Sequence, residues 1–133
     1  MADLTITVAN IDWVSGGRAR LDAAETVTAG DVLYSVTSTT CGVAVVTDAA
    51  KDAVIGIALN DATAGHPVTY ALSGAVVGFG AIITVGVVYV LSADGGIAPT
   101  ADLATSDYIS YLGHGITTSN MELKITNTGL QFA

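Results

Sequence analysis

One uncharged stretch limits the possible folds of this chain more than any other feature. No charged side chain occurs between His66 and Asp94. The stretch is longer than the ~20 apolar residues that a helix needs to cross a bilayer core. Gly74 and Gly78 also have the spacing of small residues in packed membrane helices. The stretch therefore forms either a membrane-spanning helix or a series of buried strands.

The residue types in this stretch favour strands. Glycine, serine and threonine interrupt it, and most of its apolar residues are β-branched, which suits the pleated surface of a sheet. No lysine or arginine lies between Lys51 and Lys124, so neither end has the positive flank that orients an inserted helix. We therefore predict two or three buried strands, with a break near residues 78–80, a turn at 94–96 and no membrane span.

The composition predicts one domain that buries part of its surface against other subunits. A chain of 133 residues is most simply a single domain. Charged residues make up only 12% of it, against about 25% in a typical soluble domain. Threonine, serine, glycine and asparagine can cover part of the surface, and contact between copies of the chain can cover more. The net charge of −8 disfavours binding to nucleic acid, whose phosphates would repel the chain.

The N-terminal segment differs from this acidic body. It contains Trp13, then the flexible residues 15–17, then Arg18 and Arg20, which are two of the four cationic residues. One interpretation is a core tryptophan with two solvated arginines. The other is an interface that docks on an acidic partner, with Trp13, Arg18 and Arg20 as its contact residues. We expect residues 1–25 to form an extended arm or first strand.

The remaining residues, 26–133, are expected to form a single β domain. No segment keeps a helical period of 3.6, and short apolar segments recur about every eight to twelve residues between turn signals, which is typical of an antiparallel β-sandwich or a small β-barrel. Besides the strands of the uncharged stretch, strands are predicted at residues 4–8, 25–36, 43–46, 54–59, 67–73, 108–116 and 121–125. Loops are predicted at residues 47–53, 60–66 and 97–107.

Three pairs of segments resemble each other in the same order along the chain. These pairs are 28–36 with 84–92, 54–59 with 111–116, and 68–74 with 123–129. The order predicts two repeated β units packed on each other. Chance similarity within a chain rich in glycine, valine and threonine is the alternative.

Residues that carry chemistry are dispersed. Cys41 is the single cysteine and has no disulfide partner, and His66 and His114 have no second ligand at metal-binding spacing. We therefore predict no enzyme activity, no metal and no cofactor. The alternative is a small hydrolase that uses turn carboxylates such as Asp48 and Asp52. The first residues lack the charge pattern of a secretory signal, so cytoplasmic synthesis is expected.

Four motifs resemble those of tailed-bacteriophage capsid cement proteins, which are also called head decoration proteins. They are Gly56–Leu59 (GIAL), Ala64–Tyr70 (AGHPVTY), Tyr89–Ser92 (YVLS) and Asp107–Gly113 (DYISYLG). The resemblance covers residues 28 to 125. It implies a β fold, frequent trimers, a clamp over joints between major capsid proteins, and no catalytic residues.

The combined prediction is a phage cement protein made in the host cytoplasm. It would form a homotrimer and bind the outer surface of the assembled major capsid protein lattice, as part of the virion. The alternative is a tail-fibre or baseplate β module that binds a host glycan.

Overall fold

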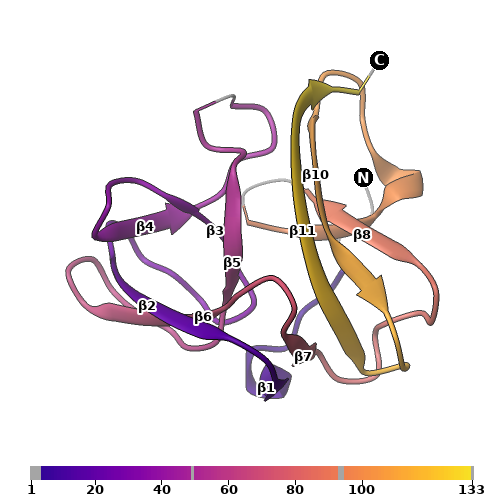
Figure 1. Cartoon of the computed structure of the whole chain (residues 1–133), viewed down its shortest axis with the longest axis horizontal. Helices are drawn as coiled ribbons and strands as arrows, with labels where there is room; N and C mark the ends of the chain where they lie inside the picture. The colour runs from indigo at the N-terminus through magenta and orange to yellow at the C-terminus, as the bar shows by residue number, and fades with distance from the viewer. Residues whose placement is uncertain (1–3, 49, 93–94, 133) are drawn as a thin grey trace.

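The structure, a computed structural model, describes residues 4–48, 50–92 and 95–132, which form a closed β-barrel beside a six-stranded sheet (Figure 1). The barrel strands are β2 (Arg18–Ala23), β3 (Val32–Ser35), β4 (Thr40–Val43), β5 (Val54–Ala58) and β6 (Pro67–Ala71). The sheet strands are β1 (Asp12–Ser15), β7 (Val76–Gly78), β8 (Val88–Leu91), β9 (Ile97–Pro99), β10 (Tyr108–Gly115) and β11 (Asn120–Gln131). The all-β prediction is confirmed: of the two expected architectures the small β-barrel is present, and it stands beside an open sheet.

Helical structure is minimal. The described residues contain two short 3₁₀ helices, η1 (Val8–Asn10) and η2 (Thr100–Asp102). None of the helices in the described part of the chain has the length and apolarity that crossing a membrane would require. The uncharged stretch forms β6, β7 and β8 instead, and β7 ends at Gly78, at the predicted break.

The barrel closes through strand β2. Its strand order is β2-β4-β3-β5-β6, and β2 pairs with β6 in antiparallel register from Arg18 opposite Ala71 to Asp22 opposite Pro67. The other edge of β2 pairs with β4 in parallel register, with Asp22 opposite Thr40. Because β2 has a neighbour on each side, the barrel has no free sheet edge.

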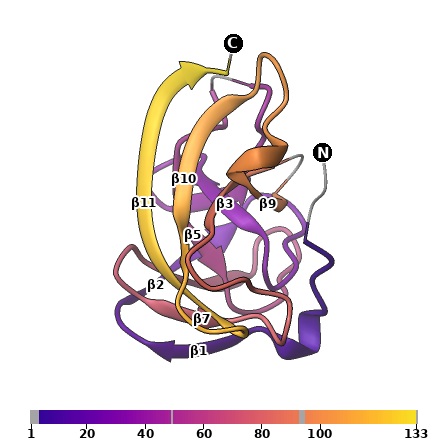
Figure 2. The same ribbon diagram turned by 90° about the vertical axis from the view of Figure 1, so that its right-hand side faces the viewer.

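The six-stranded sheet is open. Its order is β1-β7-β11-β10-β8-β9, and every pairing in it is antiparallel. Figure 2 shows β10 and β11 as a long curved pair.

The two bodies repeat one strand order. In the barrel, neighbouring strands follow the order β4-β3-β5-β6-β2, and in the sheet they follow β9-β8-β10-β11-β7, with antiparallel pairing at every step of both. The three similar segment pairs of the sequence fall on β3 and β8, on β5 and β10, and on β6 and β11. The predicted pair of repeated β units is therefore present in the connectivity of the strands.

Two hydrophobic cores result from this arrangement. The barrel interior contains Ala23, Val27, Leu33, Cys41, Ala58, Ala62, Val68 and Tyr70. A larger core joins the two bodies and includes Phe79, Ile83, Tyr89, Leu91, Ile97, Leu112, Met121 and Leu123 from the sheet half. Strand β3 serves both cores, because Val32 and Tyr34 belong to the larger core while Leu33 belongs to the barrel interior.

Hydrogen bonds reinforce the contact between the bodies. The side-chain amide of Asn127 on β11 donates to the carbonyl oxygen of Val54 on β5 at 3.0 Å, and its oxygen accepts from the Val54 amide at 2.9 Å. The buried Ser110 hydroxyl donates to the carbonyl oxygen of Asp52 at 2.7 Å. The opposite body shields the main-chain groups of Asp52 and Val54 from water, and these bonds satisfy them.

The N-terminal expectations need correction. Residues 4–8 alternate in polarity but form no strand. Leu4 donates one main-chain hydrogen bond to Ile97 at 2.7 Å, Leu4 and Ile6 pack on the larger core, and η1 follows. Packing of Leu4 and Ile6 thus accounts for two of the alternating apolar residues, while Val8 is exposed. Within the expected arm of residues 1–25, of which 1–3 lie outside the described residues, β1 joins the sheet and β2 joins the barrel.

Other boundaries also differ from the prediction. The strand expected at 43–46 is wrong apart from Val43. Strand β4 spans Thr40–Val43 and pairs with β3, whereas Ala44 and Val46 are buried outside any strand. The segment 97–107, expected as a loop, contains β9 and η2. Strand β11 extends to Gln131, since β10 supplies a partner along its length. The predicted turn at 94–96 begins at Asp94, which lies outside the described residues.

Candidate partner-binding site

A tight joint between β1 and β2 places the candidate contact residues. Gly16 has a φ of 94°, in the left-handed region that glycine adopts without strain. A Cβ at this position would also overlap the Cα of Ala75. The joint lets β1 enter the sheet and β2 enter the barrel, so residues before and after it lie close together at the corner where the two bodies meet.

Trp13 and Arg18 form a stacked pair at this corner. The guanidinium carbon of Arg18 lies 3.9 Å from the centroid of the Trp13 ring, within the range of a cation–π contact. Arg18 is exposed and Trp13 is partly buried. The indole Nε1 of Trp13 is buried and has no hydrogen-bond partner. An unpaired buried donor is costly, so this nitrogen marks a group that the folded chain leaves unsatisfied.

Arg20 lies on the same outward face of β2, two residues beyond Arg18. It borders an open hollow of about 290 Å³ that is also lined by Leu21, Asp22, Ser38 and Thr39. In the part of the chain that the structure describes, neither arginine forms an ion pair with a carboxylate. The structure thus brings two of the three predicted residues into contact and places the third beside them on one strand face.

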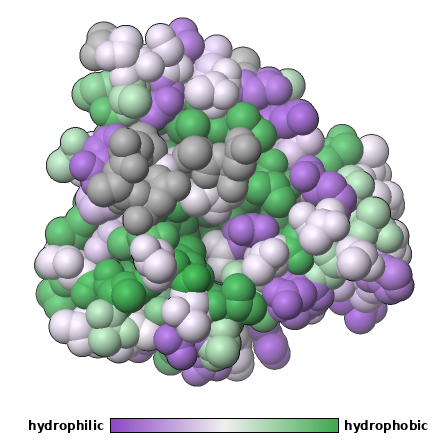
Figure 3. Space-filling view, turned by 180° about the vertical axis from the view of Figure 1, so that it is seen from behind, coloured by the Kyte–Doolittle hydropathy of each residue, from purple (hydrophilic) through white to green (hydrophobic). Residues whose placement is uncertain are grey.

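An exposed apolar cluster on the open sheet was not predicted as a site. Val85, Val88 and Ile116 are 59%, 39% and 37% exposed. Val85 bridges to Gly115, next to Ile116, so these side chains lie at one end of the sheet. Figure 3 shows apolar atoms gathered on the side of the molecule that holds the sheet. The sequence prediction missed this cluster because it assigned the whole β-branched stretch to buried strands.

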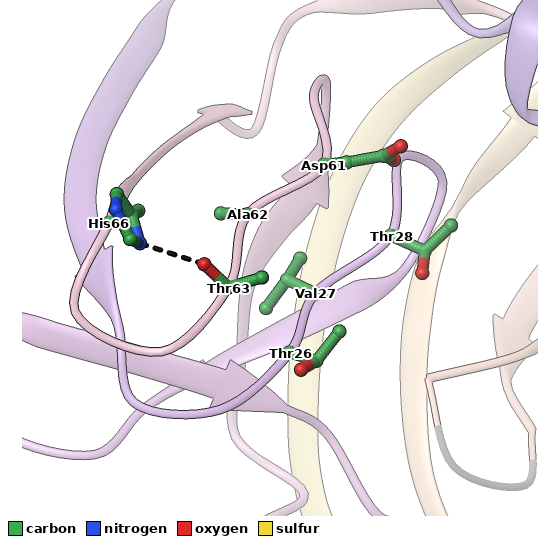
Figure 4. Close-up of a pocket in the computed structure, with 7 residues that line it drawn as sticks. All are labelled: Thr26, Val27, Thr28, Asp61, Ala62, Thr63 and His66. Carbon is green, nitrogen blue, oxygen red and sulfur yellow. Dashed lines mark hydrogen bonds between the residues drawn. The ribbon is translucent and has the colours of Figure 1, made fainter.

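Another hollow lies on the barrel half, between residues 26–28 and residues 61–66 (Figure 4). It is open, with a volume of about 440 Å³. The Thr63 hydroxyl and His66 Nδ1 are hydrogen-bonded at 2.8 Å. The Asp61 carboxylate points away from His66 in Figure 4 and accepts the Ala29 amide at 2.9 Å. The hollow therefore lacks the third group that would orient His66 as a base for Thr63.

The other chemically suggestive residues are engaged in local structure. Asp48 accepts the Ala50 amide at 2.8 Å, and Asp52 is buried. Burial raises the pKa of the Cys41 thiol, with a smaller contribution from the charge of Asp22, which disfavours the nucleophilic thiolate. Across residues 4–48, 50–92 and 95–132, no three potential metal-binding side chains gather at one place.

Three carboxylates lie near one another on the barrel half. Burial raises the pKa of Asp31, and the neighbouring charges of Asp61 and Glu25 raise it further, while a hydrogen bond from the Thr28 amide acts in the opposite direction. That bond, 2.9 Å long, holds the turn that leads into β3. The carboxylate of Asp31 therefore has a structural role in this turn.

Comparison with models of known protein families gives no match for this chain, and comparison with curated proteins gives none either.

Proposed function

We propose that this chain is a phage head decoration protein that binds the outer surface of the assembled major capsid protein lattice. The observation that carries the proposal is the placement of the four cement-like motifs. Gly56–Leu59 begins within β5, Ala64–Tyr70 leads into β6, Tyr89–Ser92 covers most of β8, and Asp107–Gly113 leads into β10. The resemblance therefore extends over the paired strands of both repeated units, which supports a likeness of the whole scaffold.

Binding to a lattice explains how such a protein would act without a catalytic site. A protein that binds the assembled shell and not its separate subunits shifts the equilibrium toward the shell by mass action. Many copies on one lattice add avidity without a new kind of contact. In this proposal Trp13, Arg18 and Arg20 contact the capsid protein.

Self-association into a homotrimer is part of the same proposal. The exposed cluster of Val85, Val88 and Ile116 offers apolar surface that a second copy can bury. Closed symmetry would give each copy the same environment at that surface. The low content of charged residues fits a subunit that is not exposed to solvent on every side.

The test is binding to assembled heads. The purified chain is mixed with expanded heads that lack decoration and, in parallel, with unassembled major capsid protein. We expect saturable co-sedimentation with heads alone, and cryo-electron microscopy should show added density on the outer head surface. Absence of binding to heads, or equal binding to the unassembled protein, would contradict the proposal.

A second candidate is a tail-fibre or baseplate module that binds a host glycan. It is favoured by a hollow of about 170 Å³ on the sheet, lined by Val88, Tyr111, Gly113, His114, Lys124 and Thr126. An aromatic ring beside a few polar groups is a common arrangement in small-ligand sites. Density on the tail and none on the head, with glycan binding that Tyr111→Ala removes, would favour this function.

A further inference from the structure

The Trp13–Arg18 pair leaves two groups without a polar partner. The indole Nε1–H is buried and has no acceptor. The guanidinium of Arg18, whose contact is with the ring face, has no ion-pair partner among the described residues. A guanidinium presents a planar fork of donors that matches a carboxylate in two parallel hydrogen bonds. The pair therefore has unused donors and lacks an acceptor.

The charge distribution indicates what kind of acceptor fits. The chain carries a net charge of −8, and Arg18 and Arg20 are two of its four cationic residues. Both lie on the outward face of β2, and Arg20 borders the hollow that Ser38 and Thr39 line with hydroxyl groups. The cationic strip attracts an acidic segment, and the negative charge on the rest of the protein repels that segment from other surfaces.

We propose that the Trp13–Arg18 pair is a receptor for a carboxylate on an acidic segment of the partner protein. The incoming carboxylate binds the Arg18 guanidinium, Arg18 leaves the ring face, and the indole N–H gains access to an acceptor. A second carboxylate of the segment is held by Arg20. This inference rests on the proposed function and names the chemistry that the capsid contact would need.

The flanking residues argue for a carboxylate and against a polyphosphate. Asp12 precedes Trp13 on β1, and Asp22 follows Arg20 on the same face of β2; both are exposed. A short acidic segment can pair with the two arginines between these carboxylates. A nucleic acid carries charge at every nucleotide and would meet repulsion at both ends of the strip.

The sole tryptophan makes the test direct. Trp13 is the only tryptophan in the chain, so its fluorescence reports on the site alone. The full chain is titrated with hexaglutamate, and with hexaglutamine as the uncharged control peptide. We expect a saturable change in Trp13 emission with hexaglutamate alone, weakened by added salt because the arginines are exposed.

Matched variants test the role of the guanidinium. Arg18→Gln should weaken binding of hexaglutamate about tenfold or more, the effect of losing a charge-assisted hydrogen bond. Arg18→Lys keeps the positive charge but loses the planar fork of donors. Its affinity for hexaglutamate should lie between that of the unaltered chain and that of Arg18→Gln. Lys51→Gln removes one positive charge from the loop before β5 and should leave binding unchanged. Thermal unfolding should differ among the three by about 5 °C or less, since exposed cation–π contacts are weak.

Several results would overturn the inference. They are equal binding of hexaglutamate by Arg18→Gln and the unaltered chain, an equal response to hexaglutamine, or tighter binding of a single-stranded oligonucleotide than of the peptide. Head binding separates the two proposals. If Arg18→Gln decorates heads at full occupancy, the carboxylate receptor fails while the decoration function stands. If the chain binds hexaglutamate and ignores heads, the decoration function fails while the receptor stands.

Discussion

The barrel and the six-stranded sheet share one strand order, yet only the barrel closes. In the barrel, β2 pairs with both β6 and β4, so every strand has two neighbours. In the sheet, the equivalent strand β7 pairs with β11 and with the added strand β1, and β9 remains at the far end. The comparison shows that one strand order gives two architectures. The partner of its last strand decides between them: β2 pairs with β4 and closes the barrel, whereas β7 pairs with β1 and leaves the sheet open.

Equivalent residues of the two bodies differ in exposure. Ala29 in the barrel half is 6% exposed, whereas Val85, which occupies the matching position in the sheet half, is 59% exposed. Val32 on β3 is buried, whereas its counterpart Val88 on β8 is 39% exposed. On the barrel half these positions are covered within the subunit, and Val32 joins the core shared by the two bodies, whereas their counterparts on the open sheet are exposed.

The largest effect is expected in the core that the two bodies share. Phe79 is fully buried there, so Phe79→Ala should lower the free energy of unfolding by about 3–5 kcal/mol. Urea unfolding followed by circular dichroism and by Trp13 fluorescence should give one coincident transition. Leu130→Ala, at a position 67% exposed, should change stability by about 0.5 kcal/mol or less. Two separate transitions would show that the bodies are independent.

A second pair of variants compares the same glycine in the two bodies. A Cβ on Gly56 would overlap the carbonyl oxygen of Ala71, and a Cβ on Gly113 would overlap that of Glu122. Each alanine variant should lose about 1–3 kcal/mol through overpacking. Gly56→Ala should cost more, because a closed barrel cannot widen one strand pair without straining the others. Chemical denaturation of both variants measures the difference, and a larger cost at Gly113 would contradict this view of closure.

The hydrogen bonds between the bodies provide the next test. Asn127→Leu removes both bonds to Val54 and leaves the Val54 amide and carbonyl without these partners. The free energy of unfolding should fall by about 1–3 kcal/mol. Hydrogen exchange of the Val54 amide should accelerate more than exchange within the barrel interior. Thr126→Ala, at the exposed neighbouring position, is the control and should leave that amide protected. Unchanged exchange in Asn127→Leu would mean that packing alone joins the bodies.

The raised pKa of Asp31 predicts a smaller, pH-dependent effect. In the alignment of residues 28–36 with 84–92, Asp31 corresponds to Val87, so the barrel half has a carboxylate where the sheet half has an apolar side chain. Since the pKa in the folded state lies above the ordinary value of 3.8, the folded chain binds the proton more tightly than the unfolded chain. Its contribution to stability is complete below pH 3.8 and is lost as the pH rises through the raised pKa.

Asp31→Asn removes that titration and can still accept the Thr28 amide. The variant should therefore be more stable than the unaltered chain at pH 7, with the difference disappearing below the ordinary pKa of an aspartate. Thermal unfolding over a pH series measures this. A gain in stability of the same size at every pH would show that the charge of Asp31 is not its cause.

The smallest effect on stability is expected at the exposed valines. Val85→Asp and Val36→Asp each change an exposed valine, the first on the sheet half and the second on the barrel half, so each should alter stability by about 0.5 kcal/mol or less. Only Val85→Asp should reduce self-association in sedimentation velocity, because a charge there opposes burial against a second copy. An equal loss in Val36→Asp would place the contact elsewhere.

Local patterns predict the strands of this fold better than their partners. The strands β5, β6 and β10 follow from apolar segments bounded by turn signals, and the paired glycines indicate the repeat. The closure of the barrel depends on Thr40 and Cys41 lying parallel to Asp22 and Ala23, and no local signal carries that register.

The candidate site shows the same division. Residue type singles out Trp13 and Arg18, because aromatic and arginine side chains are common anchors of interfaces. Their stacking depends on the Gly16 joint and its close approach to Ala75, which becomes visible once both bodies are folded. The exposed apolar cluster at Val85 could not be predicted, because the sequence does not show that the residues between β7 and β8 lie outside the strands.

The pairing of β1 with β7 sets an order of events during translation. The strands of the barrel, β2 to β6, leave the ribosome before β7, so the barrel can form while the second unit is still being made. Residues 12–15 must wait for residues 76–78, and Leu4 must wait for Ile97. Strand β1 thus gains its partner only after the barrel strands that follow it in the chain, and the Trp13–Arg18 pair is fixed only once residues 76–78 have been made.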